Sequence, residues 1–173
     1  MATINNLEHK FYRDNSKQLL DDGKLFLASD ANIALAQTAS RSYALTPNTD
    51  RGGSISVARI RGGFVKLTLD IFEGATLTTG SGTDLNPVSV NRNGPFLPLA
   101  ILEYNPTISD DGIGLTNGVT FHGTAGVGNV SSFGEAVDQA FFKVDNTKKY
   151  LFRITNNDST TTDMSIIFYG VMD

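Results

Sequence analysis

Alternation of apolar and polar residues along the chain predicts a series of short β-strands. The clearest case is the segment 64–72 (FVKLTLDIF), in which Val65, Leu67, Leu69 and Ile71 occupy every second position. Because successive side chains of a strand point to opposite faces, these four aliphatic residues share one face, and that face must point inward. The segment therefore predicts one strand of a half-buried sheet.

Weaker versions of the same pattern predict further strands on both sides of that segment. Between them, residues 73–95 are rich in Gly, Thr and Asn and predict a long connection. Strands at this spacing are typical of two packed antiparallel sheets. The expected fold class is all-β, a jelly-roll-like β-sandwich. The other predicted strands are 25–29, 32–45 (as one strand or two), 54–60, 98–105, 113–115, 119–121, 139–144, 149–156 and 164–172.

Two of these predicted strands lie very close together in the sequence. Residues 139–144 and 149–156 are separated only by the polar residues 145–148, with Asn146 and Thr147 at the centre. A four-residue connection between two apolar runs favours a β-hairpin. We therefore expect these two segments to pair with each other.

The N-terminal segment differs from the rest of the chain. Residues 1–22 are polar and mixed in charge, with weak helical spacing among a few apolar residues. They contain neither the basic nor the apolar region of a secretory signal, so no such signal is expected. The pattern predicts an N-terminal arm or short helix over 1–22, followed by a single sandwich domain over 23–173.

Composition supports an all-β fold and excludes several kinds of chemistry. Ser, Thr, Asn and Gly make up 62 of the 173 residues, as strands joined by tight turns require. The absence of cysteine excludes disulfides, a thiol nucleophile and thiolate metal sites. The only histidines, His9 and His122, lie far apart in sequence, so neither a metal nor a cofactor is expected. No apolar run reaches the roughly 20 residues of a membrane span, so no membrane partner is expected.

Four groups of residues resemble catalytic or ligand sites, but a plainer interpretation fits each one better. The glycine-rich run 123–128 lacks the following helix and Lys of a nucleotide loop. The run 110–112 (DDG) lacks the other carboxylates of a calcium loop and predicts a turn. Asp70 and Glu73, three residues apart on an extended segment, point to opposite faces and form no glycosidase pair without a bulge. No motif gives His122 a Ser or acidic partner. We expect no catalytic residues, and a protein that is not an enzyme.

Charge is distributed unevenly along the chain. Residues 1–66 contain nine Lys/Arg and six Asp/Glu, a balance of +3, whereas residues 67–173 contain five and twelve, a balance of −7. The two sum to the formal net charge of −4. This pattern favours a molecule with two differently charged ends. Binding to nucleic acid requires a dense basic stripe, so nucleic acid is not expected as a partner.

Three stretches resemble a family of virion structural proteins of tailed bacteriophages. The first is IFEGATLTTGSGTDLNPVSVNRNG (71–94), a strand followed by a Gly/Thr loop and an Asn-Arg-Asn. The second is EYNPTISDDGIGL (103–115), in which a strand leads to Pro-Thr and an acidic-Gly turn. The third is the closing region FFKVDNTKKYLFRITNNDSTTTDMSIIFYGVMD (141–173). No catalytic signature belongs to these motifs.

The resemblance implies a structural role in the virion. It favours a head decoration (cement) protein on the capsid exterior, with the major capsid protein as its partner and a homo-oligomer, preferably a trimer, as its assembly. Basic side chains of the N-terminal part would then dock onto an acidic capsid surface. The candidate capsid-contacting residues are Lys10, Arg13, Lys17, Arg41, Arg51, Arg59 and Arg61.

Two other functions remain open on the sequence alone. The protein could belong instead to the neck, the tail or a head fibre of the virion, where its copy number would be far lower. It could also be a β-sandwich that binds host surface glycans, in which case the isolated protein would be retained by a glycan matrix.

Overall fold

The computed structural model describes residues 24–48, 53–62, 66–91, 100–116, 118–122, 131–133 and 142–172. The predicted arm over 1–22 lies outside these residues. The described part of the chain is built from β-strands joined by turns. No helix in it is long and apolar enough to span a membrane. The strands are β1 (Leu25–Leu35), β2 (Ser40–Pro47), β3 (Gly53–Gly62), β4 (Lys66–Glu73), β5 (Thr76–Thr78), β6 (Thr83–Asp84), β7 (Val88–Ser89), β8 (Ala100–Tyr104), β9 (Thr107–Asp110), β10 (Ile113–Gly114), β11 (Val119–His122), β12 (Ser131–Phe133), β13 (Phe142–Val144), β14 (Tyr150–Asn156) and β15 (Thr162–Met172).

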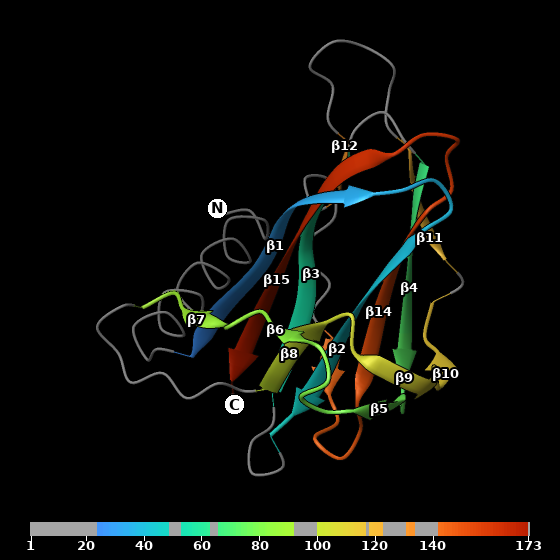
Figure 1. Cartoon of the computed structure of the whole chain (residues 1–173). Coiled ribbons are helices and arrows are strands. Elements are labelled where there is room, and N and C mark those ends of the chain that lie inside the picture. The colour runs from blue at the N-terminus through green and yellow to red at the C-terminus, as the bar shows by residue number, and fades with distance from the viewer. Residues whose placement is uncertain are drawn as a thin grey trace, which may run out of the picture.

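Two antiparallel sheets contain most of these strands (Figure 1). Sheet A has the order β12-β3-β15-β1-β7, and β13 also pairs with β3. Sheet B has the order β10-β4-β14-β2-β8-β6, and β11 also pairs with β4. The short strands β5 and β9 form a separate two-stranded ribbon.

The order of pairing is that of a jelly roll. The first long strand pairs with the last, β1 with β15, and the second with the one before it, β2 with β14. The next two pairs, β3 with β12 and β4 with β11, continue the same nesting inward. The chain therefore follows one long antiparallel hairpin folded over into two sheets, which confirms the expected fold class.

The core lies between the two sheets. Aliphatic side chains of β4, including Leu67 and Leu69, point into it, as their alternation predicts. Three aromatic rings meet at its centre: Phe168 contacts Tyr43 and Phe152 edge-to-face, at centroid distances of 5.4 and 5.3 Å. Edge-to-face contacts of this kind add to the free energy gained by burying the rings.

A second, smaller apolar cluster lies on the outer face of sheet B. The β5–β9 ribbon covers this face and buries Leu77 against Ala44 and Leu151. Ala44 alternates in β2 with Tyr43 and Leu45, which point into the main core. Where the β5–β9 ribbon covers it, sheet B therefore buries apolar side chains on both of its faces.

The predicted hairpin between 139–144 and 149–156 is wrong. β13 pairs with β3 in sheet A, whereas β14 lies between β4 and β2 in sheet B. The connection 145–149 therefore crosses from one sheet to the other. A local pattern cannot distinguish these two outcomes, because a short connection suits either one. Both flanks of β14 are occupied by longer strands, which leaves no edge for β13.

Candidate interaction surface at one end of the sandwich

Segments far apart in sequence meet at the end of the sandwich where β4 finishes and β14 begins. Glu73 and Tyr150 face each other across these two strands. The segments are 73–82, 103–112 and 145–153, and we call this region the charged end. Each segment falls within one of the three stretches that carry the resemblance to phage virion proteins.

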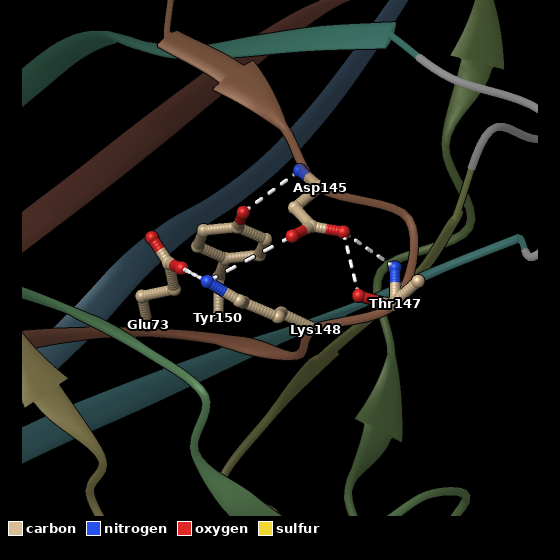
Figure 2. A network of polar contacts seen from close by, with 5 residues as sticks. All are labelled: Glu73, Asp145, Thr147, Lys148 and Tyr150. Atoms are coloured by element: carbon tan, nitrogen blue, oxygen red, sulfur yellow. Dashed lines mark hydrogen bonds and ion pairs between the residues drawn. The ribbon is translucent and has the colours of Figure 1, made fainter.

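The turn between β13 and β14 is held by ionic contacts and hydrogen bonds, as Figure 2 shows. The Lys148 ammonium bonds to the carboxylate of Glu73 and lies 3.7 Å from Asp145 Oδ2. Asp145 Oδ1 accepts hydrogen bonds from the backbone N–H and the hydroxyl of Thr147, at 2.9 and 2.7 Å. The Asp145 N–H donates to Tyr150 Oη at 2.8 Å. Asp145 and Lys148 therefore both have fixed partners.

The ionisation of these groups reflects their contacts. The hydrogen bond from the Thr147 hydroxyl lowers the pKa of Asp145 below its ordinary value. The hydrogen bond to Glu73 raises the pKa of Lys148. Burial raises the pKa of the Tyr150 hydroxyl. At neutral pH Asp145 is therefore ionised, Lys148 is protonated and the Tyr150 hydroxyl is neutral.

Lys149 connects the same turn to the β5–β9 ribbon. Its backbone carbonyl accepts hydrogen bonds from the N–H groups of Gly74 and Ala75, at 2.8 and 3.2 Å. Its ammonium donates to the carbonyl oxygen of Leu77 and the hydroxyl of Thr79, both at 2.9 Å. One residue thus binds the ribbon through both its backbone and its side chain.

Arg153 and Asp111 form a two-pronged ion pair on the outer face of sheet B. The guanidinium donates to both carboxylate oxygens, at 2.6 and 2.5 Å, and lies over the ring of Phe72 at 5.3 Å. The hydrogen bond from Arg153 lowers the pKa of Asp111. The turn 110–112, which contains Asp111, needs glycine at position 112. The φ angle of Gly112 is +87°, and a Cβ there would lie 2.4 Å from the Glu73 carbonyl oxygen.

Glu103 is a buried carboxylate that organises the loop 79–82. Its side chain is in β8, and the residue is only 1% exposed. Its two oxygens accept hydrogen bonds from the N–H groups of Gly80 and Gly82, each at 3.0 Å. A Cβ at position 82 would lie 2.6 Å from the Tyr104 carbonyl oxygen, so glycine permits this close approach. The carboxylate therefore depends on two glycines for its partners.

These contacts make the charged end a preorganised surface. Each acidic side chain in it, from Glu73 to Asp145, accepts from a lysine, an arginine, a threonine or a backbone N–H. Among the described residues, no buried side-chain nitrogen or oxygen is left without a partner. Groups held in this way are suited to presenting a fixed shape and charge pattern to a partner.

Arg41, one of the candidate capsid-contacting residues, makes contacts inside the sandwich. Its guanidinium donates to Asp30 of β1, at 2.6 and 2.8 Å, and lies 4.1 Å from the ring centre of Tyr104. Burial is the largest single influence on the pKa of Arg41 and acts to lower it. The hydrogen bond to Asp30 and the interactions with the charge of Asp30 and with Tyr43 together outweigh burial, so the pKa is raised. Since Tyr43 also donates to Asp30, at 3.2 Å, this group joins the two sheets.

The other candidate basic residues lie partly or wholly outside the described residues. The backbones of Arg59 and Arg61 belong to β3 and pair with Ile167 and Ser165 of β15. Their side chains lie outside the description, as do the residues Lys10, Arg13, Lys17 and Arg51.

The residues that resemble catalytic or metal sites are not brought together. Glu73 bonds to Lys148, whereas Asp70 lies opposite Arg153 in the sheet and acts on its guanidinium through charge. Residues 110–112 form the predicted turn, in which Asp110 Oδ1 accepts from the Gly112 N–H at 2.9 Å. The described residues contain no group of three His, Asp or Glu placed to hold a metal ion. The side chain of His122 and the run 123–128 lie outside the description.

Two residues with important contacts were missed by the sequence analysis. Glu103 stands in an apolar strand, AILEY, between two core positions, and its burial could have been suspected from that setting. Asn156 is fully buried at the far end of β14. It is the last residue of the predicted strand 149–156 and is followed by a polar turn, so no local signal identifies its burial.

Comparisons with known proteins identify no family. No protein-family model matches the chain, and no curated protein matches it. Among solved structures, it is weakly similar to the VP2 protein of infectious bursal disease virus. A D431N mutant in T=1 particles is 7% identical with a TM-score of 0.21, and a subviral particle is 10% identical with a TM-score of 0.10. The matches cover 86% and 84% of this chain but only 39% and 38% of those chains. At these TM-scores, nothing about fold or function is carried over from VP2.

Proposed function

We propose that this chain is a structural protein of a tailed-phage virion that decorates the exterior of the capsid and stabilises the shell without catalysis. One observation supports the proposal most. The three stretches that resemble phage virion proteins, separated in sequence, come together in one end of the jelly roll and bond to one another there. Parts of all three stretches therefore contribute to one surface of this fold.

The charged end suits binding to a large, rigid partner. Its loops are held by Glu103, Lys149 and the Arg153–Asp111 pair, so little ordering is left to occur on binding. Surfaces fixed in advance lose less conformational entropy when they associate. A decoration protein, which must remain attached to a shell of many copies, benefits from this property.

In this proposal the basic N-terminal part of the chain, without Arg41, contacts the capsid in addition to the charged end. The guanidinium of Arg41 is already bound to Asp30, so it supports the sandwich itself. Attachment through the remaining basic residues has to weaken as salt rises, because screening reduces charge-based binding between exposed groups. Binding to capsids that does not change between low and high salt would contradict this mode of docking.

The copy number of the chain in purified particles tests the proposal directly. Quantitative mass spectrometry gives the ratio of this chain to the major capsid protein. A ratio near one, or near one third, is expected for a protein spread over the whole capsid. A much lower ratio, equivalent to a few copies of this chain per particle, would assign it to the neck, the tail or a fibre instead. Absence from the particles would refute a virion role altogether.

A glycan-binding role has one observation in its favour. A row of hydroxyl groups crosses four strands on the outer face of sheet B, because Thr155 faces Ser40 on one side and Thr68 on the other, and Thr68 faces Thr120. Such a row offers regularly spaced donors and acceptors to a polyol. Retention of the isolated protein on a glycan matrix, lost in Thr68→Val but kept in the ribbon variant Thr76→Val, would support this second candidate.

A further inference from the structure

The turn 110–112 contains a dipeptide, Asp111-Gly112, that can rearrange without an enzyme. In an Asp-Gly pair, the glycine nitrogen attacks the side-chain Cγ of the aspartate and water is lost, which closes a succinimide ring. Water then opens the ring at either carbonyl and gives aspartate again or isoaspartate, in which the backbone runs through the former side chain. Glycine favours the attack because it has no side chain to hinder it. The Asp111 side chain is 39% exposed, so water reaches it.

The Asp111 carboxylate is held in a form that resists this attack. Ring closure needs the neutral acid, because only the acid has a hydroxyl that can leave as water. The Arg153 guanidinium donates to both carboxylate oxygens, at 2.6 and 2.5 Å, and this contact lowers the pKa of Asp111. Two-pronged bonds of this kind also fix the orientation of the carboxylate. Arg153 therefore disfavours the reactive acid and keeps Cγ in one position.

The attacking nitrogen is engaged as well. The Gly112 N–H donates to Asp110 Oδ1 at 2.9 Å, and this bond has to break before the nitrogen can attack Asp111. The backbone of Gly112 has little room to turn, because a Cβ built on it would lie 2.4 Å from the Glu73 carbonyl oxygen and 2.8 Å from the Ala75 nitrogen. Both reacting groups are therefore bound to other partners in the folded protein.

Isoaspartate at position 111 would not fit between the strands that the turn joins. On one side of the turn, Asp110 pairs with Thr76 of β5, and on the other, Ile113 pairs with Glu73 of β4. Isomerisation adds one methylene group to the backbone between these two pairs. Because neighbouring backbone atoms already approach the turn closely, the added atom would displace β9 or β10. The β5–β9 ribbon would then lose its register with sheet B.

We propose that Asp111-Gly112 is a site of aspartate isomerisation that Arg153 and Asp110 keep inactive in the folded protein. Arg153 thereby has a positioning role in addition to its contribution to stability, since it holds the carboxylate away from the reaction. The proposal concerns the isolated chain and does not depend on a virion role.

Incubation of the chain in water enriched in heavy oxygen tests the proposal. Each passage through the succinimide leaves one heavy oxygen at residue 111, whether it ends as aspartate or isoaspartate, and mass spectrometry of the digested chain measures it. Because the reaction needs local opening of the turn, we expect it to be at least ~10-fold slower in the folded chain than in urea. Asp22-Gly23, in the same Asp-Asp-Gly sequence, gives the rate of the unfolded dipeptide in the urea sample.

Variants of Arg153 test its role in the protection. Arg153→Gln removes the charge and the two-pronged bond, and we expect it to raise the rate at Asp111 in the folded chain by ~10-fold. Arg153→Lys keeps the charge without the fork, so its rate should be intermediate. Lys148→Gln is the matched control, because Lys148 is a cation of the same charged end whose partners are Glu73 and Asp145. It should leave the rate at Asp111 unchanged. Circular dichroism at the incubation temperature confirms that each variant is folded.

Three results would overturn the proposal. Equal rates at Asp111 in the folded chain and in urea would mean that the turn gives no protection. A folded Arg153→Gln variant as slow as the unaltered chain would mean that Arg153 does not hold the site inactive. Equal acceleration in Lys148→Gln and Arg153→Gln would assign the effect to general loosening of the charged end. If Arg153→Gln fails to fold, the rate in folded Arg153→Lys decides, and a rate equal to that of the unaltered chain contradicts the role of the two-pronged bond.

Discussion

The two ends of strand β14 are held in place by different interactions, charged side chains at one end and a buried amide at the other. At its start is the charged end, where Lys148 bonds to Glu73 and Lys149 holds the ribbon. At its finish is Asn156, a fully buried neutral amide. The Asn156 amide N–H groups donate to three carbonyl oxygens, those of Leu35, Ala36 and Thr160, at 2.8 to 3.2 Å. We call this second region the amide end.

The two ends should differ in how their interactions depend on pH and salt. The amide of Asn156 does not titrate and is shielded from water, so the turns 36–39 and 157–161 should remain joined at any moderate pH or salt. The charged end is exposed over much of its area, and its ion pairs weaken with screening and with protonation. The amide end should therefore be insensitive to pH and salt, whereas the stability of the charged end should depend on both.

Removal of the buried amide should have the largest effect. Asn156→Ala removes the side chain that bonds to the carbonyls of Leu35 and Thr160 and to the Asp158 N–H. Buried polar groups left unsatisfied cost about 1–3 kcal/mol each, so we expect a loss of roughly 3 kcal/mol in the free energy of unfolding. Urea denaturation measures it.

Asn157→Ala is the matched control for this experiment, because Asn157 is the exposed neighbour of Asn156 and its side chain bonds to the Thr68 hydroxyl. We expect it to cost less than about 1 kcal/mol. Equal losses in the two variants would show that burial of the amide does not distinguish the two ends.

Glu103→Gln tests the charged end at its buried point. A glutamine side chain has one accepting oxygen instead of two, so the N–H of either Gly80 or Gly82 loses its partner. We expect a loss of about 2 kcal/mol in the free energy of unfolding. Hydrogen exchange should also accelerate in the loop 79–82 and not in the turn 157–161. Acceleration at both ends alike would mean that the ends do not unfold separately.

The smallest effect concerns the pH dependence of the Asp111–Arg153 pair. The pKa of Asp111 is lowered from 3.8 by Arg153, so the pair stabilises the fold above that pH and loses its contribution as pH falls through the lowered pKa. Asp111 is partly exposed, and screening limits the effect to about 0.5 kcal/mol at neutral pH. Asp111→Asn should therefore lower the melting temperature slightly at pH 7 and hardly at all near pH 2. A difference that persists at pH 2 would exclude an ionic cause.

The local pattern of the sequence predicted the strands with good accuracy. Alternation in 64–72 identified β4 and its inward face, and the weaker patterns at 54–60 and 164–172 correspond to β3 and β15. The division of 32–45 was left open, and the chain turns at 36–39, with Thr38 at a positive φ of 57°. These features are readable because a half-buried strand shows its burial in the sequence at every second residue.

The roles of single charged residues were less predictable. Arg41 was proposed to contact a capsid, yet its side chain bonds to Asp30 across the two sheets. Glu103 has no sequence signal of its own beyond an apolar setting, and the glycines that satisfy it lie 21 and 23 residues away. A charge in a sequence does not reveal its partner when that partner arrives from another strand.

The all-β sandwich can be predicted from the amino-acid sequence alone, because period-two burial and turn-forming residues are properties of neighbouring positions. The pairing of the strands, in contrast, follows from the packing of the whole fold. β13 and β14 follow each other closely but belong to different sheets, whereas β1 and β15 pair from opposite ends of the described chain. Strand partners are chosen by the packing of two whole sheets around a shared core, and that choice is recorded in no short stretch of sequence.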